Sequence, residues 1–287
     1  MAKQLDSSPL VSVVIPVWNT EDNIEKLVRE LFSQTYQNIE IIAIDDGSSD
    51  NSLSILKKLA KEDTRLQVEH QKNAGVSAAR NRGINLATGK YLVFIDSDDE
   101  VMPEFIEAMI EAMQKNPNAI LAIMGREYRK LRENKIEQLY MNPRRKRRPR
   151  ELLSNYTTYL MILDGRMYGM TGRIFITETI RKHHIRVEEG RDFAEDTKFA
   201  FDYLSAQDGE IIFIPKPLYI YNFGTETSIV RNSSLKWGNW QKSYQELENW
   251  MRDDNRGRIS ARAKLLLLLV QLRWRIAHYH SNRRAQK

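Results

Sequence analysis

The chain has 287 residues, of which 41% are hydrophobic and 29% are charged, and its formal net charge is +6. This composition supplies enough apolar side chains for a folded core and argues against wholesale disorder. The absence of cysteine excludes disulfides, thiolate catalysis and cysteine-ligated zinc. The N-terminal residues lack the apolar core of a signal peptide, and no apolar run approaches the roughly 20 residues needed to cross a bilayer, so we expect a cytoplasmic protein.

Positive charge is concentrated in two segments that contain no acidic residue. Residues 144–150 carry six Arg and Lys side chains and residues 256–287 carry nine, so the rest of the chain has a net charge of −9. Basic segments of this kind attract nucleic acid, anionic lipid or phosphorylated ligands. Because no nucleic-acid-binding motif accompanies them, we expect no nucleic acid as a partner.

In the first half of the chain, short β-branched runs alternate with segments whose apolar residues recur at helical spacing. The runs predict strands at residues 11–17, 39–44, 66–70, 91–95 and 119–124. The periodic segments predict helices at residues 21–34, 51–62, 75–87 and 103–114. Such alternation is typical of an α/β fold with a mostly parallel sheet flanked by helices, in which ligands bind beyond the carboxyl ends of the strands.

The second half is less regular. Its pattern predicts helices or strands at residues 151–163 (helix), 172–185 (strand, then helix), 195–204 (helix), 211–214 and 218–223 (strands), 235–251 and 258–280 (helices). The last helix would carry a leucine-rich face beside a basic face. Two explanations stay open for it: packing on the body or on a second subunit of a homodimer, or docking on an anionic membrane surface.

An unusual cluster of acids follows one of the predicted strands. Residues 90–100, KYLVFIDSDDE, pass from an apolar run to Asp96, Asp98, Asp99 and Glu100. Carboxylates this close repel one another unless a cation compensates their charge. Asp96 and Asp98 occupy alternate positions of an extended segment and can point the same way. Carboxylate oxygens suit Mg²⁺ or Mn²⁺, which share their coordination shell with water and substrate phosphates, so we expect one of these ions as cofactor.

Several spaced motifs resemble the inverting family 2 glycosyltransferases, which have the GT-A fold. They are VSVVIPVWN (residues 11–19), SQTYQNIEIIAIDDGSSDNS (33–52) and NAGVSAARNRGINLATGKYLVFIDSDDEV (73–101). The resemblance resumes at GRIF (172–175) and continues through EGRDFAEDTKF (189–199) to KPLYIYN (216–222). It implies an enzyme that moves a sugar from a nucleotide-sugar, most often a UDP-sugar, to an acceptor hydroxyl with inversion of the anomeric centre.

The resemblance also implies roles for single residues. The positions that match the family's nucleotide-binding residues are Pro16, Val17, Trp18, Asp45, Asp46, Asn73, Gly75, Arg80 and Asp96. Asp96 and Asp98 match its metal-binding Asp-x-Asp, with the metal on Asp98, where a cation would neutralise the charge of the leaving nucleotide. Glu195 and Asp196 match its catalytic pair, whose Asp is the general base for the acceptor hydroxyl.

The implied organisation is a GT-A catalytic domain at residues 1–225, with a nucleotide-sugar half at about 1–101 and an acceptor half at about 102–225. Residues 226–287 would form a basic helical C-terminal extension. The acceptor that we expect is a glycan, in particular a lipid-linked one at the inner membrane face, in capsule, exopolysaccharide or cell-wall synthesis. The enzyme would be a hexosyl- or N-acetylhexosaminyl-transferase.

Plainer explanations stay open for the same residues. Asp45 and Asp46 precede a good turn sequence, Glu195 and Asp196 could only cap a helix, and Trp18 could belong to the core. Two other functions are also possible: a sugar nucleotidyltransferase, or a non-catalytic glycan- or membrane-binding module. The first normally has a Gly-rich pyrophosphate loop after its first strand, which residues 16–23, PVWNTEDN, lack.

Overall fold

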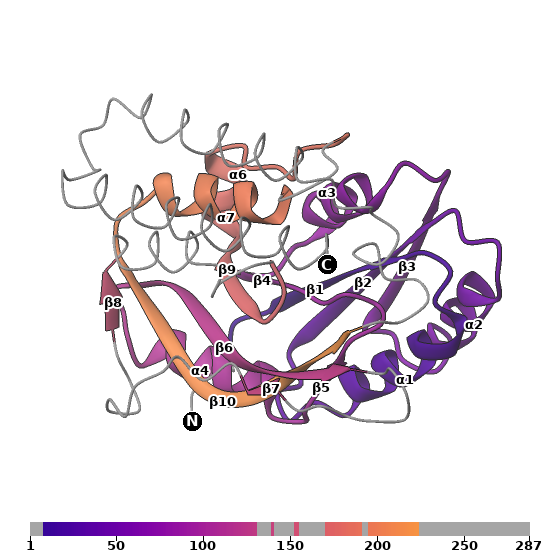
Figure 1. The fold of residues 1–287 in the computed structure, drawn as a ribbon, viewed down its shortest axis with the longest axis horizontal. Coiled ribbons are helices and arrows are strands. Elements are labelled where there is room, and N and C mark those ends of the chain that lie inside the picture. Colours follow the sequence, from indigo (N-terminus) through magenta and orange to yellow (C-terminus); the bar gives the residue numbers. More distant parts are fainter. Residues whose placement is uncertain (1–7, 131–138, 141–151, 155–169, 191–194, 224–287) are drawn as a thin grey trace, which may run out of the picture.

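The structure, a computed structural model, describes residues 8–130, 139–140, 152–154, 170–190 and 195–223 (Figure 1). Its first half contains four parallel strands in the order β3-β2-β1-β4. Their bounds are β1 (Val11–Val17), β2 (Ile39–Asp46), β3 (Leu66–Gln71) and β4 (Tyr91–Phe94). β-Branched residues dominate the buried strands, and these are the residues that pack well on a pleated surface.

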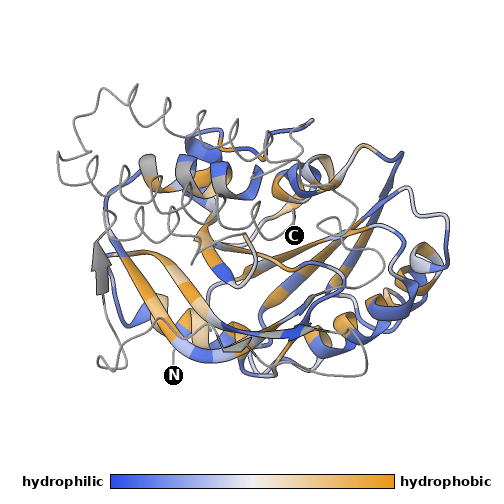
Figure 2. Cartoon of the chain, in the orientation of Figure 1, coloured by the Kyte–Doolittle hydropathy of each residue, from blue (hydrophilic) through white to orange (hydrophobic). Residues whose placement is uncertain are grey.

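Helices cover both faces of this sheet. On one face lie α1 (Glu21–Phe32), α2 (Ser52–Leu59) and α4 (Phe105–Gln114), whose apolar residues share a core with Val13 and Ile15 of β1. The opposite face carries α3 (Val76–Leu86), α6 (Thr177–Lys182) and α7 (Glu195–Ser205). The helices on that face pack around Val14 of β1 and its neighbours. Figure 2 shows the strands as mainly apolar and the outer helices as half polar. Alternate residues of one strand thus build two separate cores.

The second half extends the sheet with antiparallel pairs. β9 (Arg173–Ile176) lies between β4 and β6 (Ala119–Lys130) and is antiparallel to both. β6 pairs in parallel with β10 (Glu210–Phe223), and β10 pairs antiparallel with β5 (Glu100–Val101). Two short strands, β7 (Leu139–Tyr140) and β8 (Leu152–Ser154), pair with β6 and β10. The expected parallel arrangement therefore holds for the first four strands, and the complete sheet is mixed.

Two predictions for the second half need correction. The strands expected at residues 211–214 and 218–223 are one strand, β10, because register shifts around Pro217 let the ladder continue past residues that lack an N–H donor. The helix expected at residues 151–163 is wrong at its start, since Leu152–Ser154 pair with the edge of β10, and this long-range pairing overrides the local pattern. The rest of that expected helix, both basic segments and the helices expected at residues 235–251 and 258–280 lie outside the described residues.

None of the helices in the described ranges combines the length and the hydropathy that crossing a membrane requires.

Candidate active site

The carboxyl ends of the four parallel strands meet at one edge of the sheet. Strand register sets Val17 of β1 opposite Asp45 of β2, and Asp46 of β2 opposite Gln71 of β3. Asp96 lies just beyond the end of β4, which is parallel to β1. This edge is where ligands bind in parallel sheets. The structure thus brings the predicted nucleotide-binding segments together.

Asp46 holds the segment that leads into α3. Its Oδ1 accepts hydrogen bonds from Gln71 Nε2 and the Ala74 N–H, and its Oδ2 accepts one from the Gly75 N–H, each at 2.8 Å. The turn after Asp46 needs glycine, because Gly47 has φ +71° and a Cβ there would lie 2.7 Å from the backbone nitrogen of Asn73. The segment that the family resemblance assigns to the nucleotide border, with Asn73 and Gly75 exposed, is therefore positioned by Asp46.

Asp45 points to the other face of the sheet from Asp46, as neighbouring residues of a strand do. Its carboxylate is fully buried, and its Oδ2 lies 2.6 Å from His70 Nδ1 at the end of β3. Asp45 therefore links the ends of two strands on the face that α1 and α2 cover. A contact between Asp45 and a nucleotide stays a prediction.

The turn after β1 combines buried and exposed residues. Pro16 and Val17 are buried within the strand, whereas the Trp18 side chain is 47% exposed. The alternative that Trp18 belongs to the core is therefore wrong. Sequence reasoning missed Asn19, which binds the loop after β2: its N–H donates to Ser48 Oγ at 3.0 Å, and its Oδ1 accepts from the Ser49 N–H at 2.8 Å. The exposed Trp18 indole therefore lies next to two loops that are hydrogen-bonded to each other.

The acids of residues 96–100, hereafter the acidic turn, have different partners. Asp96 Oδ1 accepts a hydrogen bond from Arg80 at 2.8 Å. Glu100 pairs with Lys26 of α1 and Arg129 of β6 at 2.8 and 2.9 Å. Burial by itself would raise the pKa of Glu100. The interactions with Lys26 and Arg129 are among those that outweigh burial, so this pKa lies below the usual value. Two acids of the turn, Asp96 and Glu100, are therefore paired with protein cations.

Asp99 is the buried member of the acidic turn, with a side chain only 2% exposed. Burial raises its pKa well above the usual value, and the charges of Asp96 and Asp98 raise it further. Its carboxylate accepts hydrogen bonds from the Tyr219 hydroxyl and, at 3.0 Å, from the Asn222 N–H. Asp99 thus joins the acidic turn to β10. The sequence analysis did not predict this role, although β10 contains KPLYIYN, one of the motifs that resemble the family.

Arg80 joins the two halves of the chain. The Arg80 side chain projects from α3 and is only 7% exposed. Its guanidinium binds Asp96 at 2.8 Å and Glu195 at 3.1 Å. Glu195 is the first residue of α7. Burial raises the pKa of Glu195, and the neighbouring charge of Asp196 raises it further, whereas Arg80 opposes the change. The structure therefore places the predicted catalytic pair next to the predicted metal-binding acids.

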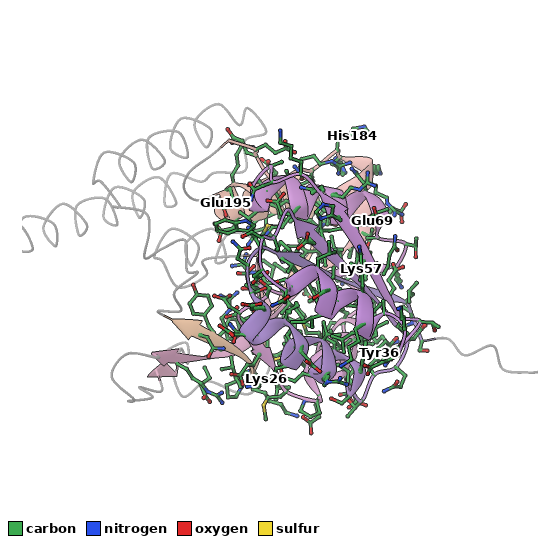
Figure 3. The ribbon with its side chains drawn as sticks, turned by 90° about the vertical axis from the view of Figure 1, so that its right-hand side faces the viewer. Lys26, Tyr36, Lys57, Glu69, His184 and Glu195 are labelled. Atoms are coloured by element: carbon green, nitrogen blue, oxygen red, sulfur yellow. The ribbon has the colours of Figure 1, made fainter. Side chains whose placement is uncertain are left out.

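An aromatic cluster fixes α7 in this position. Phe199 packs edge-on against Phe94 of β4 and Phe175 of β9, with ring centroids 5.8 and 5.5 Å apart. Tyr203, one turn later, packs against Phe175 at 4.9 Å. The N-terminus of α7, with Glu195 and Asp196 in its first turn, is thereby held at the strand ends, and carboxylates are favourable at that end of a helix. Figure 3 shows Glu195 at the upper left of the molecule and Lys26, the partner of Glu100, toward its lower end.

The donor groups fit a cation that is shared with a substrate. Among the residues that the structure describes, no group of three or more His, Asp or Glu side chains could enclose a metal ion. Mg²⁺ and Mn²⁺ need no such cage, since they bind through one or two carboxylates together with water and substrate phosphates. Asp98, the position that the family resemblance assigns to the metal, belongs to the acidic turn, and its metal role stays a prediction.

Comparison with known proteins agrees with this geometry. Residues 12–170 match the model of glycosyl transferase family 2. The glycosyltransferase GlyG of Streptococcus pneumoniae serotype 4 is 30% identical over 247 residues, which cover 80% of this chain and 76% of that protein. These two findings come from sequence and establish the family.

Solved structures share the fold. TarS of S. aureus in complex with UDP-GlcNAc has a TM-score of 0.73 at 18% identity, covering 90% of this chain and 70% of that one. The mannosyltransferase PcManGT of Pyrobaculum calidifontis, in complex with GDP-Man and Mn²⁺, has a TM-score of 0.63 at 16% identity, covering 91% of this chain and 69% of that one. With its strand-end acids, its Arg80 bridge and these similarities, the chain belongs to glycosyl transferase family 2 and has the GT-A fold.

Proposed function

We propose that this glycosyltransferase moves a sugar from a nucleotide-sugar, in the first place a UDP-sugar, to a hydroxyl of a glycan acceptor with inversion. The observation that carries the proposal is the Arg80 bridge, which brings the strand-end acid Asp96 and the α7 acid Glu195 to one guanidinium. Structural neighbours in complex with UDP-GlcNAc and with GDP-Man support a nucleotide-sugar donor.

On the donor side, the proposal assigns the nucleotide to the edge formed by the ends of β1 and β2. Trp18 offers an exposed ring on which a base can stack, and Asp46 orders the neighbouring segment. Asp98 would hold Mn²⁺ or Mg²⁺, which when bound would neutralise charge on the leaving diphosphate. Arg80, which pairs with Asp96, lowers the repulsion between the acidic turn and that diphosphate.

On the acceptor side, Asp196 is the proposed general base. Its partner Glu195 is engaged by Arg80 and serves to position the start of α7. The Asp196 carboxylate would take the proton of the acceptor hydroxyl, whose oxygen then forms a bond to the anomeric carbon. The bond from that carbon to the nucleotide breaks in the same displacement, with its electron pair leaving on the diphosphate. One displacement inverts the anomeric centre.

The acceptor must supply the hydroxyl that attacks the anomeric carbon. We propose a glycan, in particular one linked to a lipid, in capsule, exopolysaccharide or cell-wall synthesis, with a hexose or N-acetylhexosamine as the transferred sugar. The support is the sequence of residues 256–287, whose positive charges and leucine-rich face suit a peripheral contact with anionic membrane. Packing on the catalytic domain or on a second subunit is the competing role for that segment.

A panel of nucleotide-sugars tests the proposal. The protein should bind one donor more tightly with Mn²⁺ than with EDTA and should hydrolyse that donor slowly in the absence of an acceptor. If no donor binds, the chain is instead a non-catalytic glycan- or membrane-binding module. Release of pyrophosphate from a nucleoside triphosphate and a sugar phosphate would identify a sugar nucleotidyltransferase.

A further inference from the structure

Two residues of β10 bind the acidic turn, although they follow it by more than a hundred positions. The Asn222 side chain donates from Nδ2 to the carbonyl oxygen of Asp98 at 2.8 Å, and its backbone N–H donates to Asp99 Oδ1 at 3.0 Å. The Tyr219 hydroxyl donates to the Asp99 carboxylate. The turn is therefore held by polar contacts from a strand that belongs to the opposite half of the domain.

The strand that makes these contacts is itself rigidly placed. Tyr219 is fully buried, with its ring centroid 5.7 Å from that of Phe105 and 5.4 Å from the Arg126 guanidinium carbon. β10 also pairs with β5, which begins at the last residue of the acidic turn, and the Met102 N–H donates to Leu218 O at 2.9 Å. Asn222 and Tyr219 thus reach the turn from a fixed backbone, as a positioning role requires.

The amide of Asn222 has one possible orientation. Its Nδ2 faces two acceptors, the Asp98 carbonyl oxygen and Glu100 Oε1 at 3.3 Å, so an exchange of its N and O atoms would set oxygen against oxygen. The Oδ1 atom is buried and has no hydrogen-bond partner within the described part of the chain. A buried acceptor without a partner destabilises a fold and offsets part of what the two Nδ2 hydrogen bonds contribute.

From these contacts we infer that Asn222 and Tyr219 are positioning residues that hold the acidic turn, Asn222 through the Asp98 carbonyl and Tyr219 through Asp99, and thereby set the affinity of the site for its divalent cation. The inference rests on the proposed function, in which Asp98 binds that cation. Mg²⁺ and ions like it demand near-ideal octahedral geometry, so the carboxylate must be presented at one place. Repulsion among the acids of the turn would otherwise displace it.

A metal titration of nucleotide binding tests the inference. Wild type and Asn222→Ala are titrated by calorimetry with UDP or GDP, whichever wild type binds more tightly, over a series of Mn²⁺ concentrations and in EDTA. Loss of the partners that orient a metal ligand weakens metal affinity about 10- to 100-fold. We expect Asn222→Ala to raise the Mn²⁺ concentration for half-maximal enhancement by about tenfold or more. Its nucleotide affinity in EDTA should match that of wild type.

Two further variants separate positioning from stability. Tyr219→Phe keeps the packed ring and removes the hydroxyl, which donates to Asp99 and accepts from the Asp96 N–H at 3.5 Å. It should shift the Mn²⁺ midpoint in the same direction. Ile212→Val shortens a buried side chain in the first part of β10, where the strand pairs with Ala122 and Leu152. This control should lower the melting temperature and leave the Mn²⁺ midpoint unchanged.

The outcomes distinguish the inference from the proposed function. A folded Asn222→Ala protein with the wild-type Mn²⁺ midpoint overturns the inference, and so does an equal loss of nucleotide affinity with Mn²⁺ and in EDTA. Asp98→Asn is measured beside it. If Asp98→Asn abolishes the effect of Mn²⁺ while Asn222→Ala does not change it, only the inference fails. If Asp98→Asn keeps the wild-type effect, or if Mn²⁺ has no effect on wild type, the assigned metal role of Asp98 fails and the inference with it.

Discussion

Arg80 and Glu195 are 115 positions apart in the chain, yet Arg80 Nη1 lies 3.1 Å from Glu195 Oε1. The other end of the same guanidinium binds Asp96. This one side chain therefore ties α3 and the end of β4, in the proposed nucleotide half, to α7 in the proposed acceptor half. Because it is buried, water does not screen these pairs as it does at the surface.

Replacing Arg80 with alanine should cost both stability and activity. Two partly buried carboxylates would lose their cation, and removing one partner of a buried ion pair destabilises a fold by about 3–5 kcal/mol. Arg80→Lys should recover only part of the loss, since a lysine presents a point charge in place of the planar fork that reaches two carboxylates. The measurements are chemical denaturation and transfer rate.

Arg82 supplies the matched control for Arg80. It lies on the same helix, is about half exposed and pairs with Glu69 at 3.1 Å. Surface pairs of this kind contribute roughly 0–1 kcal/mol, so Arg82→Ala should be close to wild type. Equal losses in the two alanine variants would contradict the bridging role of Arg80.

Asp98→Asn should remove the Mn²⁺-dependent part of donor binding and leave the fold intact. The substitution keeps the shape of the side chain and removes the charge that binds the cation. Calorimetric titration of nucleotide with Mn²⁺ and with EDTA measures the effect. Asp22→Asn removes the same charge from an exposed position in α1 and should have no effect. Equal enhancement by Mn²⁺ in wild type and Asp98→Asn would sink the assignment.

Asp196→Asn should separate binding from catalysis. We expect nucleotide affinity within a few-fold of wild type and a loss of transfer by about 10² or more, the scale of a positioned acid–base group. Glu195→Gln removes the charge that pairs with Arg80 and should lower transfer by less than Asp196→Asn does. Near-normal transfer by Asp196→Asn, with a large loss in Glu195→Gln, would move the general base to Glu195.

The raised pKa of Glu195 predicts a pH dependence of stability. Burial and the charge of Asp196 raise this pKa, so the folded chain binds the proton of Glu195 more tightly than the unfolded chain does. Protonation of Glu195 therefore stabilises the folded chain. This stabilisation is fully present below the ordinary glutamate pKa and is lost as pH rises through the raised pKa of the folded chain. Denaturant unfolding at several pH values should show Glu195→Gln losing less stability than wild type over that range. Parallel curves for the two proteins would contradict this.

Truncation after Gly257 should weaken binding to anionic vesicles. Eight of the nine basic residues in the segment 256–287 would be removed, and each contributes about 1 kcal/mol near an anionic surface, an attraction that salt screens. Vesicle sedimentation at low and high salt measures the effect, with a melting curve as control. If the truncated protein melts earlier and binds vesicles as before, the segment packs on protein and the membrane role belongs elsewhere.

Much of the fold of the first half of the chain follows from the sequence because its determinants are local. The residue pattern of each segment predicts strands β1 to β4 and the helices between them. In a parallel sheet the polar carboxyl ends of these strands lie at one edge, and this does not depend on the second half of the chain. For this reason the sequence alone predicts that Asp46, Asp96 and Trp18 lie at that edge. It also predicts Glu195 at the start of a helix, since acids favour that end.

Only the tertiary structure decided which of these acids meet. No periodicity indicates that β9 inserts between β4 and β6, that the last two predicted strands are one, or that Asn222 reaches back to Asp98. Arg80 could have been an exposed helix residue, and it bridges Asp96 and Glu195 because the aromatic packing of α7 brings Glu195 to it. Contacts of this kind depend on how distant segments pack in three dimensions, and local residue patterns carry no record of that packing.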